Sequence, residues 1–253
     1  QTRLHATTVK GSNKMKLVIT LLILFATASL AQPLVIGTHH FYPPFVTQND
    51  EDEHYSGFDI DLMQAICKQI NKACIFQGMN FVDLLPALQM GHIDLSIGAI
   101  SITVRRRYQY LFSYPYLASY VQYITLSSNP IQSTQNIQDI TVGILKGTIS
   151  RKILKNAHSD KITIKPYLSL NDLKHKKIEL ALIDGFTTDY WIAASDGILK
   201  TVGEAIRVGD GYGIAALPYK QKLMQSINQA MFELEQEGTY LQIYEKYFGD
   251  KGE

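Results

Sequence analysis

Short apolar runs alternate with helical patterns along the sequence from residue 32 onward, and this alternation restricts the fold more than any other feature. In the first third, LVIGTHH, CIFQGM and HIDLSIGAIS have the composition of buried strands, while GFDIDLMQAICKQI and FVDLLPALQMG carry apolar residues at helical spacing. Further strands are predicted at ITVGIL, ITIKPY and LALIDGF, and a helical pattern from Lys220 to Phe248 is broken at Gly238. Strands that alternate with helices indicate an α/β protein with largely parallel sheets.

The N-terminal segment has the organisation of a secretory signal peptide. Met15 and Lys16 precede an apolar stretch of roughly 10 residues, and Ser29 and Ala31 are small residues at the positions before a cleavage site. The stretch is shorter than the roughly 20 apolar residues of a membrane span. We therefore expect residues 1–31 to be an upstream extension plus a signal peptide cleaved after Ala31, and the mature chain to be soluble and periplasmic.

Composition and charge exclude several classes of function. The chain of 253 residues is 46% hydrophobic and 19% charged, which suits a globular protein with a sizeable core. Four basic residues and no acidic residue precede residue 32, so the remainder holds 20 basic and 23 acidic side chains. No basic patch interleaved with aromatic residues is present, so we expect no nucleic-acid partner. The KGT tripeptide lacks the residue spacing of a phosphate-binding loop, so the sequence does not indicate nucleotide binding.

The only two cysteines are Cys67 and Cys74, with six residues between them. They lack further metal ligands at suitable spacing, so we expect neither a metal nor another cofactor, and the gap does not fit a CxxC redox motif. In an oxidising compartment a disulfide is the simplest interpretation. Two buried free thiols are the alternative.

Two strand–turn–helix units carry hydroxyl residues where an apolar run stops. In SIGAISITVRRR, Ser101 or Thr103 is expected to cap a helix formed by VRRRYQYL, and Arg106 lies where its guanidinium can grip a carboxylate. In VGILKGTISRKIL, Thr148 and Ser150 occupy similar places. Helix N-termini and hydroxyls on opposing lobes would hold a small carboxylate between them. The alternative interpretation is that the arginines form a solvated helix face.

Several stretches, in this order, resemble the extracytoplasmic solute-binding proteins of polar-amino-acid ABC transporters, and in particular the group that binds lysine, arginine, ornithine or histidine. They are LVIGTHHFYPPF, GFDIDLMQAICKQI, the cysteine pair at the same spacing, SITVRR, FSYPY, VGILKGT, LALIDG and EGTYLQIYEKYF. The resemblance implies a two-lobe fold, each lobe a mostly parallel sheet flanked by helices, with a ligand in the cleft. It implies that residues 32–118 and 212–253 form lobe 1 and that residues 119–211 form lobe 2.

The resemblance also implies roles for individual residues. Arg106 matches the arginine that pairs with the ligand α-carboxylate, and Asp184 matches the aspartate that accepts the α-ammonium group. Tyr42 and Phe81 match aromatic residues that enclose the ligand side chain. The other candidate ligand residues are Ser101, Thr148, Asp59, Gly98, Ala99 and His39.

Some positions depart from the pattern of the basic-amino-acid binders. His39 and His40 stand where that group carries an acid, Gly98 and Ala99 replace two serines, and Ile149 replaces a hydroxyl residue. The expected ligand is a polar L-amino acid, with arginine or a relative ahead of glutamine, delivered to a membrane permease by a monomer.

The sequence also allows other interpretations. Tyr42 and Phe81 could fill the core, Asp59 and Asp184 could cap helices, and His39 could be a turn residue. An enzyme on the same scaffold, similar to cyclohexadienyl or prephenate dehydratases, would need an acid or base beyond the recognition pair. His39 or His40 could serve that role. A sensory domain of a larger receptor is the third class.

Overall fold

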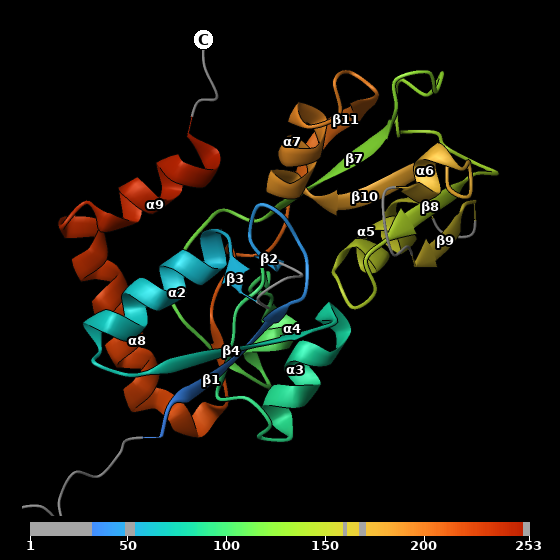
Figure 1. Cartoon of the computed structure of the whole chain (residues 1–253). Helices are drawn as coiled ribbons and strands as arrows, with labels where there is room; N and C mark the ends of the chain where they lie inside the picture. Colours follow the sequence, from blue (N-terminus) through green and yellow to red (C-terminus); the bar gives the residue numbers. More distant parts are fainter. Residues whose placement is uncertain (1–31, 49–53, 159–160, 167–170, 250–253) are drawn as a thin grey trace, which may run out of the picture. The chain divides into compact units, whose positions relative to one another are not determined.

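The computed structural model describes residues 32–48, 54–158, 161–166 and 171–249. The predicted signal peptide and its cleavage site lie outside these residues. Two five-stranded sheets organise the chain from residue 33 onward, and helices cover both of them (Figure 1). This arrangement confirms the expected two-lobe α/β fold.

The first sheet has the strand order β4-β1-β5-β12-β6. Strands β1 and β4 pair in parallel over their full length, β5 joins β1 in parallel, and β12 pairs antiparallel with both β5 and β6. Because β12 follows the whole second sheet in the chain, the first sheet is completed from both ends of the sequence. Its strands are β1 Leu34–His39, β4 Cys74–Met79, β5 Leu95–Ser96, β6 Leu111–Phe112 and β12 Ala215–Ala216.

Apolar helix faces cover both sides of the first sheet. One side packs against α2, α8 and α9, and the other side packs against α3; Figure 1 shows these helices on their two sides. The bounds are α2 Phe58–Gln69, α3 Phe81–Gln89, α4 Val104–Arg107, α8 Gln221–Gln236 and α9 Thr239–Phe248, with a short 3-10 helix at Pro218–Lys220. The predicted break lies between α8 and α9, where Gly238 takes a left-handed φ of 77°.

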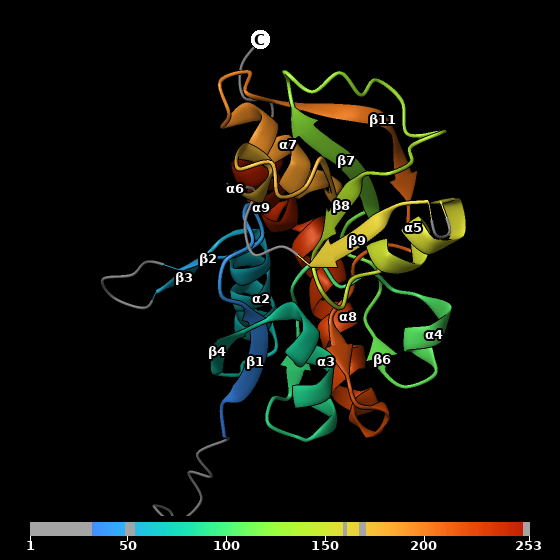
Figure 2. The ribbon, with the colours of Figure 1, turned by 90° about the vertical axis from the view of Figure 1, so that its right-hand side faces the viewer.

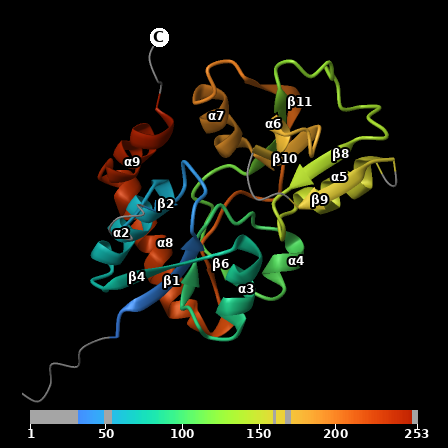
Figure 3. The same ribbon diagram turned by 45° about the vertical axis from the view of Figure 1, so that its right-hand side comes forward.

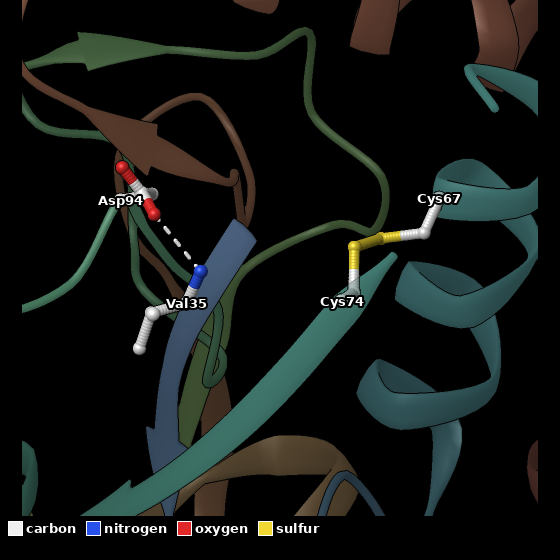
Figure 4. The surroundings of a disulfide bond; sticks show 4 residues. All are labelled: Val35, Cys67, Cys74 and Asp94. Atoms are coloured by element: carbon white, nitrogen blue, oxygen red, sulfur yellow. Dashed lines mark hydrogen bonds between the residues drawn. A yellow bond between two sulfur atoms is a disulfide. The ribbon is translucent and has the colours of Figure 1, made fainter. Parts of the chain in front are cut away.

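The predicted disulfide between Cys67 and Cys74 is confirmed. It joins the last part of α2 to the first residue of β4, as Figure 4 shows. Nearby, the carboxylate of Asp94 accepts a hydrogen bond of 2.9 Å from the backbone N–H of Val35 (Figure 4). Asp94 also pairs with Lys220. The start of the first sheet is therefore fixed by covalent, ionic and hydrogen-bond contacts.

The second sheet has the order β11-β7-β10-β8-β9. Strands β8, β9 and β10 pair in parallel, whereas β7 pairs antiparallel with β10 and β11. Each sheet is therefore mixed, with two parallel and two antiparallel strand pairs. The expectation of mostly parallel sheets is wrong to this extent. The bounds are β7 Tyr120–Leu126, β8 Thr141–Ile144, β9 Thr163–Pro166, β10 Leu180–Asp184 and β11 Leu199–Arg207. A separate hairpin pairs β2 Thr47–Gln48 with β3 Tyr55–Ser56.

Side-chain alternation along β10 divides the second core. Leu180 and Leu182 pack in a cluster with Leu154 of α5, whereas Ala181 and Ile183 pack on the opposite face with α6 and the partly buried Trp191 of α7. Figure 2 shows α5 on one side of the sheet and α6 and α7 on the other. These helices span Ser150–His158, Asn171–Lys174 and Gly185–Ala193.

Two chain segments connect the sheets, and they run side by side. The backbone N–H of Val208 donates to the carbonyl of Ser119, and that of Tyr212 donates to Leu117. Figure 3 shows the two sheets and the strands near these crossings. Among the residues that the structure describes, no helix combines the length and the apolar character needed to cross a membrane.

Candidate functional site

A cavity of about 30 Å³ lies where the ends of strands from both sheets meet. Its walls combine aromatic, apolar and charged side chains with the loops that follow β1, β5 and β8. The lining residues are His39, Tyr42, Phe81, Gly98, Ala99, Ser101, Arg106, Val121, Leu145, Thr148, Ile149, Ser150, Leu182, Ile183, Asp184 and Tyr212. All the candidate ligand residues except Asp59 are therefore brought together in one place.

Arg106 is held from both sides of this cavity. The side chain of Thr103, the N-cap residue of α4, accepts a hydrogen bond of 3.3 Å from the backbone N–H of Arg106. The guanidinium donates from Nη1 to the carbonyl of Ser101 at 2.8 Å and from Nη2 to the carbonyl of Gly147 at 3.3 Å. Burial lowers the pKa of Arg106 to about 10, so the group stays cationic at neutral pH.

Asp184 is the acidic side chain among the described residues that line the cavity. It is the last residue of β10 and the N-cap of α7, and one carboxylate oxygen accepts a hydrogen bond of 3.0 Å from the backbone N–H of Thr187. The hydroxyl of Tyr212 donates to the other oxygen. Burial, with a smaller contribution from the charge of Asp59, raises the pKa of Asp184 to about 8. The carboxyl group is both a helix cap and a wall of the cavity.

An aromatic stack forms one side of the cavity. The His39 ring lies 4.7 Å from the Tyr42 ring and 5.2 Å from the Phe81 ring, with 16° between the planes in both pairs. The guanidinium carbon of Arg106 lies 5.6 Å from the centre of the Phe81 ring. Burial, with a smaller contribution from the charge of His40, lowers the pKa of His39 to about 3. This imidazole is neutral at any pH near neutrality.

Asp59 does not line the cavity, although the sequence made it a candidate ligand residue. It is fully buried in the first turn of α2, and Oδ2 accepts a hydrogen bond of 3.0 Å from the backbone N–H of Ala99. Ala99 takes a φ of 49°, which is uncommon for a residue with a side chain. Burial raises the pKa of Asp59 to about 7. Asp59 therefore supports the loop that carries Gly98 and Ala99.

The two predicted hydroxyl residues reach the cavity but make their hydrogen bonds within the protein. Ser101 Oγ lies 2.9 Å from Ser119 Oγ, and Thr148 Oγ1 donates to the carbonyl of Leu145 at 2.7 Å. Sequence reasoning missed Tyr212, because nothing in GDGYGIAA marks a functional tyrosine. The other missed lining residues are Val121, Leu145, Leu182 and Ile183. Across the described residues, no group of three or more His, Cys, Asp or Glu side chains could hold a metal ion.

This fold and cavity define the class of extracellular binding proteins, in which a small solute is held between two lobes. Residues 34–250 match the model of the bacterial extracellular solute-binding proteins, family 3, and the chain belongs to that family. The family consists of binding proteins, so the chain is a solute-binding protein and the dehydratase alternative has no support.

Relatives and solved structures agree with this assignment. The chain is 30% identical over 235 residues to the lysine/arginine/ornithine-binding periplasmic protein of Escherichia coli (strain K12), covering 87% of this chain and 89% of that one. An arginine 3rd transport system periplasmic binding protein from Legionella pneumophila is 33% identical, with a TM-score of 0.79 and coverage of 86% and 100%. An ancestral arginine-binding protein bound to glutamine is 32% identical, with a TM-score of 0.79 and coverage of 86% and 98%.

Proposed function

We propose that this protein captures a polar L-amino acid in the cavity between its two sheets and delivers it to the permease of an ABC transporter. The observation that carries the proposal is that Arg106 and Asp184, one basic and one acidic side chain, line the same cavity. An α-amino acid carries the matching pair of charges on adjacent groups.

The chemistry of each charged group suits one end of the amino-acid backbone. A guanidinium presents N–H donors in a planar fork that matches a carboxylate. Arg106 already donates to backbone carbonyls from both Nη atoms, and a ligand carboxylate would compete for these donors. Asp184 is held in place by the N–H of Thr187 and the hydroxyl of Tyr212, so its carboxylate is oriented before an ammonium group arrives.

We further propose that residues 32–118 with 212–253 move as lobe 1 and residues 119–211 as lobe 2. The paired crossing segments near Ser119 and Tyr212 support this division, because they are the places where the chain passes between the sheets. The hydrogen bond from Arg106 to Gly147 is one that opening the lobes would break.

Export to the periplasm is part of the same proposal. The relatives are named as periplasmic proteins, and the disulfide between Cys67 and Cys74 suits an oxidising compartment. The predicted signal peptide would account for the export of the chain.

Calorimetry on ligand-stripped protein tests the function. L-amino acids should bind, whereas their Nα-acetyl and carboxamide derivatives should not, because each derivative removes one backbone charge. Replacing Arg106 with alanine should weaken binding by about 3–5 kcal/mol, more than a hundredfold, as expected when a desolvated charge loses its partner. Arg105→Ala is the matched control, because Arg105 is exposed on the same helix and does not line the cavity. If the affinity of Arg106→Ala for L-amino acids lies within tenfold of that of the unmodified protein, the assignment of Arg106 as the carboxylate-binding residue is refuted.

A further inference from the structure

The cavity contains one basic and one acidic side chain, and an amino-acid backbone pairs with both. Among the described lining residues, Asp184 is the only acid and Arg106 the only residue with a fixed positive charge. Once an α-ammonium group is paired with Asp184, none of the other described lining residues offers a carboxylate to a charged side chain of the ligand.

Two features make the cavity less suited to a second cation. Asp59, the nearby acid that could supply a counter-charge, is buried behind Ala99 and uses Oδ2 to accept that residue's N–H. The Phe81 ring, on which a guanidinium could stack, already has the Arg106 guanidinium 5.6 Å from its centre. A cationic side chain would therefore lie near a like charge without a partner of opposite charge.

Among the described lining residues, His39 is the one with a buried side-chain polar atom that lacks a hydrogen-bond partner. Its side chain is buried, it lines the cavity, and Nε2 has no hydrogen-bond partner among the residues that the structure describes. The contacts with Tyr42 and Phe81 are ring stacking, so they leave the hydrogen-bonding capacity of the nitrogen unused. A buried polar atom without a partner is costly, and a ligand group that pairs with it removes that cost.

We propose that His39 selects an amino acid with a neutral, hydrogen-bonding side chain, and that a carboxamide such as that of glutamine fits best. An amide offers both a donor and an acceptor, so it pairs with Nε2 in either tautomer of the imidazole. The inference rests on the proposed amino-acid binding. It departs from the expectation of a basic ligand, which came from the resemblance and which the names of the relatives repeat.

Calorimetric titration of ligand-stripped protein with L-glutamine, L-arginine and L-glutamate at pH 7.5 tests the inference. Glutamine should bind at least tenfold more tightly than either charged amino acid. His39→Asp should shift the ratio of arginine to glutamine affinity by at least tenfold towards arginine, because it places a carboxylate in the cavity. His40→Asp is the matched control, because it adds the same charge one residue away at an exposed position. That variant should leave the ratio within threefold.

His39→Asn provides a second variant if His39→Asp does not fold, because it keeps a neutral hydrogen-bonding side chain and should retain the preference for glutamine. If the unmodified protein binds arginine as tightly as glutamine, or more tightly, the inference is overturned. The proposed function of amino-acid binding would still stand. An equal shift in the ratio for His39→Asp and His40→Asp also overturns it. Failure of all L-amino acids to bind is a different outcome, which refutes the proposed function itself.

Discussion

Substituting Asp184 with asparagine separates the two roles of this residue. Asparagine keeps an oxygen that accepts the N–H of Thr187, so the cap of α7 is retained. The hydroxyl of Tyr212 can accept from the new amide instead of donating to it. The substitution removes only the ability to become negatively charged, so we expect stability to change by less than about 1 kcal/mol while affinity falls.

The size of the affinity loss depends on pH because the pKa of Asp184 is raised to about 8 by burial. A ligand ammonium favours the carboxylate, so binding below pH 8 must release the proton that the free carboxyl group holds. At pH 7, one unit below that pKa, removing the proton costs about 1.4 kcal/mol. The charge pair itself is expected to contribute about 3–5 kcal/mol. At pH 7 the variant should therefore bind about 1.6–3.6 kcal/mol more weakly, a loss of at least roughly fifteenfold.

Calorimetry at pH 6, 7 and 8 measures both effects. The affinity of the unmodified protein should rise about tenfold from pH 6 to pH 7 and about fivefold more from pH 7 to pH 8, since each unit below the pKa corresponds to about one decade. Asp184→Asn should lack this rise. Asp59, whose pKa is raised to about 7, is present in both proteins, so the difference between them isolates Asp184.

Asp189→Asn is the control, because Asp189 lies on the same helix and its carboxylate accepts a hydrogen bond from Tyr120 at an exposed position. Affinity that stays constant from pH 6 to pH 8 in the unmodified protein would refute the argument that burial protonates Asp184. Equal affinity of Asp184→Asn and the unmodified protein would refute its role in binding.

Three further outcomes are expected. N-terminal sequencing of periplasmic protein should show cleavage after Ala31, and an intact apolar stretch would contradict the signal peptide. Replacing Cys67 and Cys74 together with serine should lower the free energy of unfolding in urea by about 2–3 kcal/mol, from the entropy of closing so short a loop, and an unchanged midpoint and slope would contradict this. Gly185→Ala should destabilise the protein by about 1–3 kcal/mol in the same assay, because its Cβ would lie 1.7 Å from the Tyr120 ring; a stable variant would show that the ring moves at little cost.

The fold was predictable where local pattern decides the structure. The strands at 34–39 and 74–79 and the helix between them carry clear hydrophobic periodicity, and the break at Gly238 follows from a single residue. The helix predicted from VRRRYQYL is wrong in length, because α4 ends at Arg107. Tyr110 is buried and donates to the carbonyl of Leu85, and the chain then pairs with β12, more than a hundred residues later.

The candidate site shows the same division between local and distant causes. Arg106 stands in a recognisable strand-to-helix turn, so its type and position pointed to a carboxylate site, whereas the place of Asp184 in the same cavity was expected from the resemblance to the family. Tyr212 could not be found this way, because its place is set by bridges to Ser101 and Leu117, far away in the sequence. His39 lines the cavity, whereas Asp59 is buried and does not line it. This difference depends on packing that no local sequence pattern encodes.

The helix that Asp184 caps also contains Trp191, the only tryptophan in the chain. The indole is partly buried and makes an edge-to-face contact with Tyr190, with 5.2 Å between ring centres. All tryptophan emission of the protein therefore comes from a single position two turns along the helix from the carboxylate proposed to bind the ammonium group. The unlabelled protein thus provides its own optical signal for titrations, and a change in emission reports on the surroundings of one helix alone.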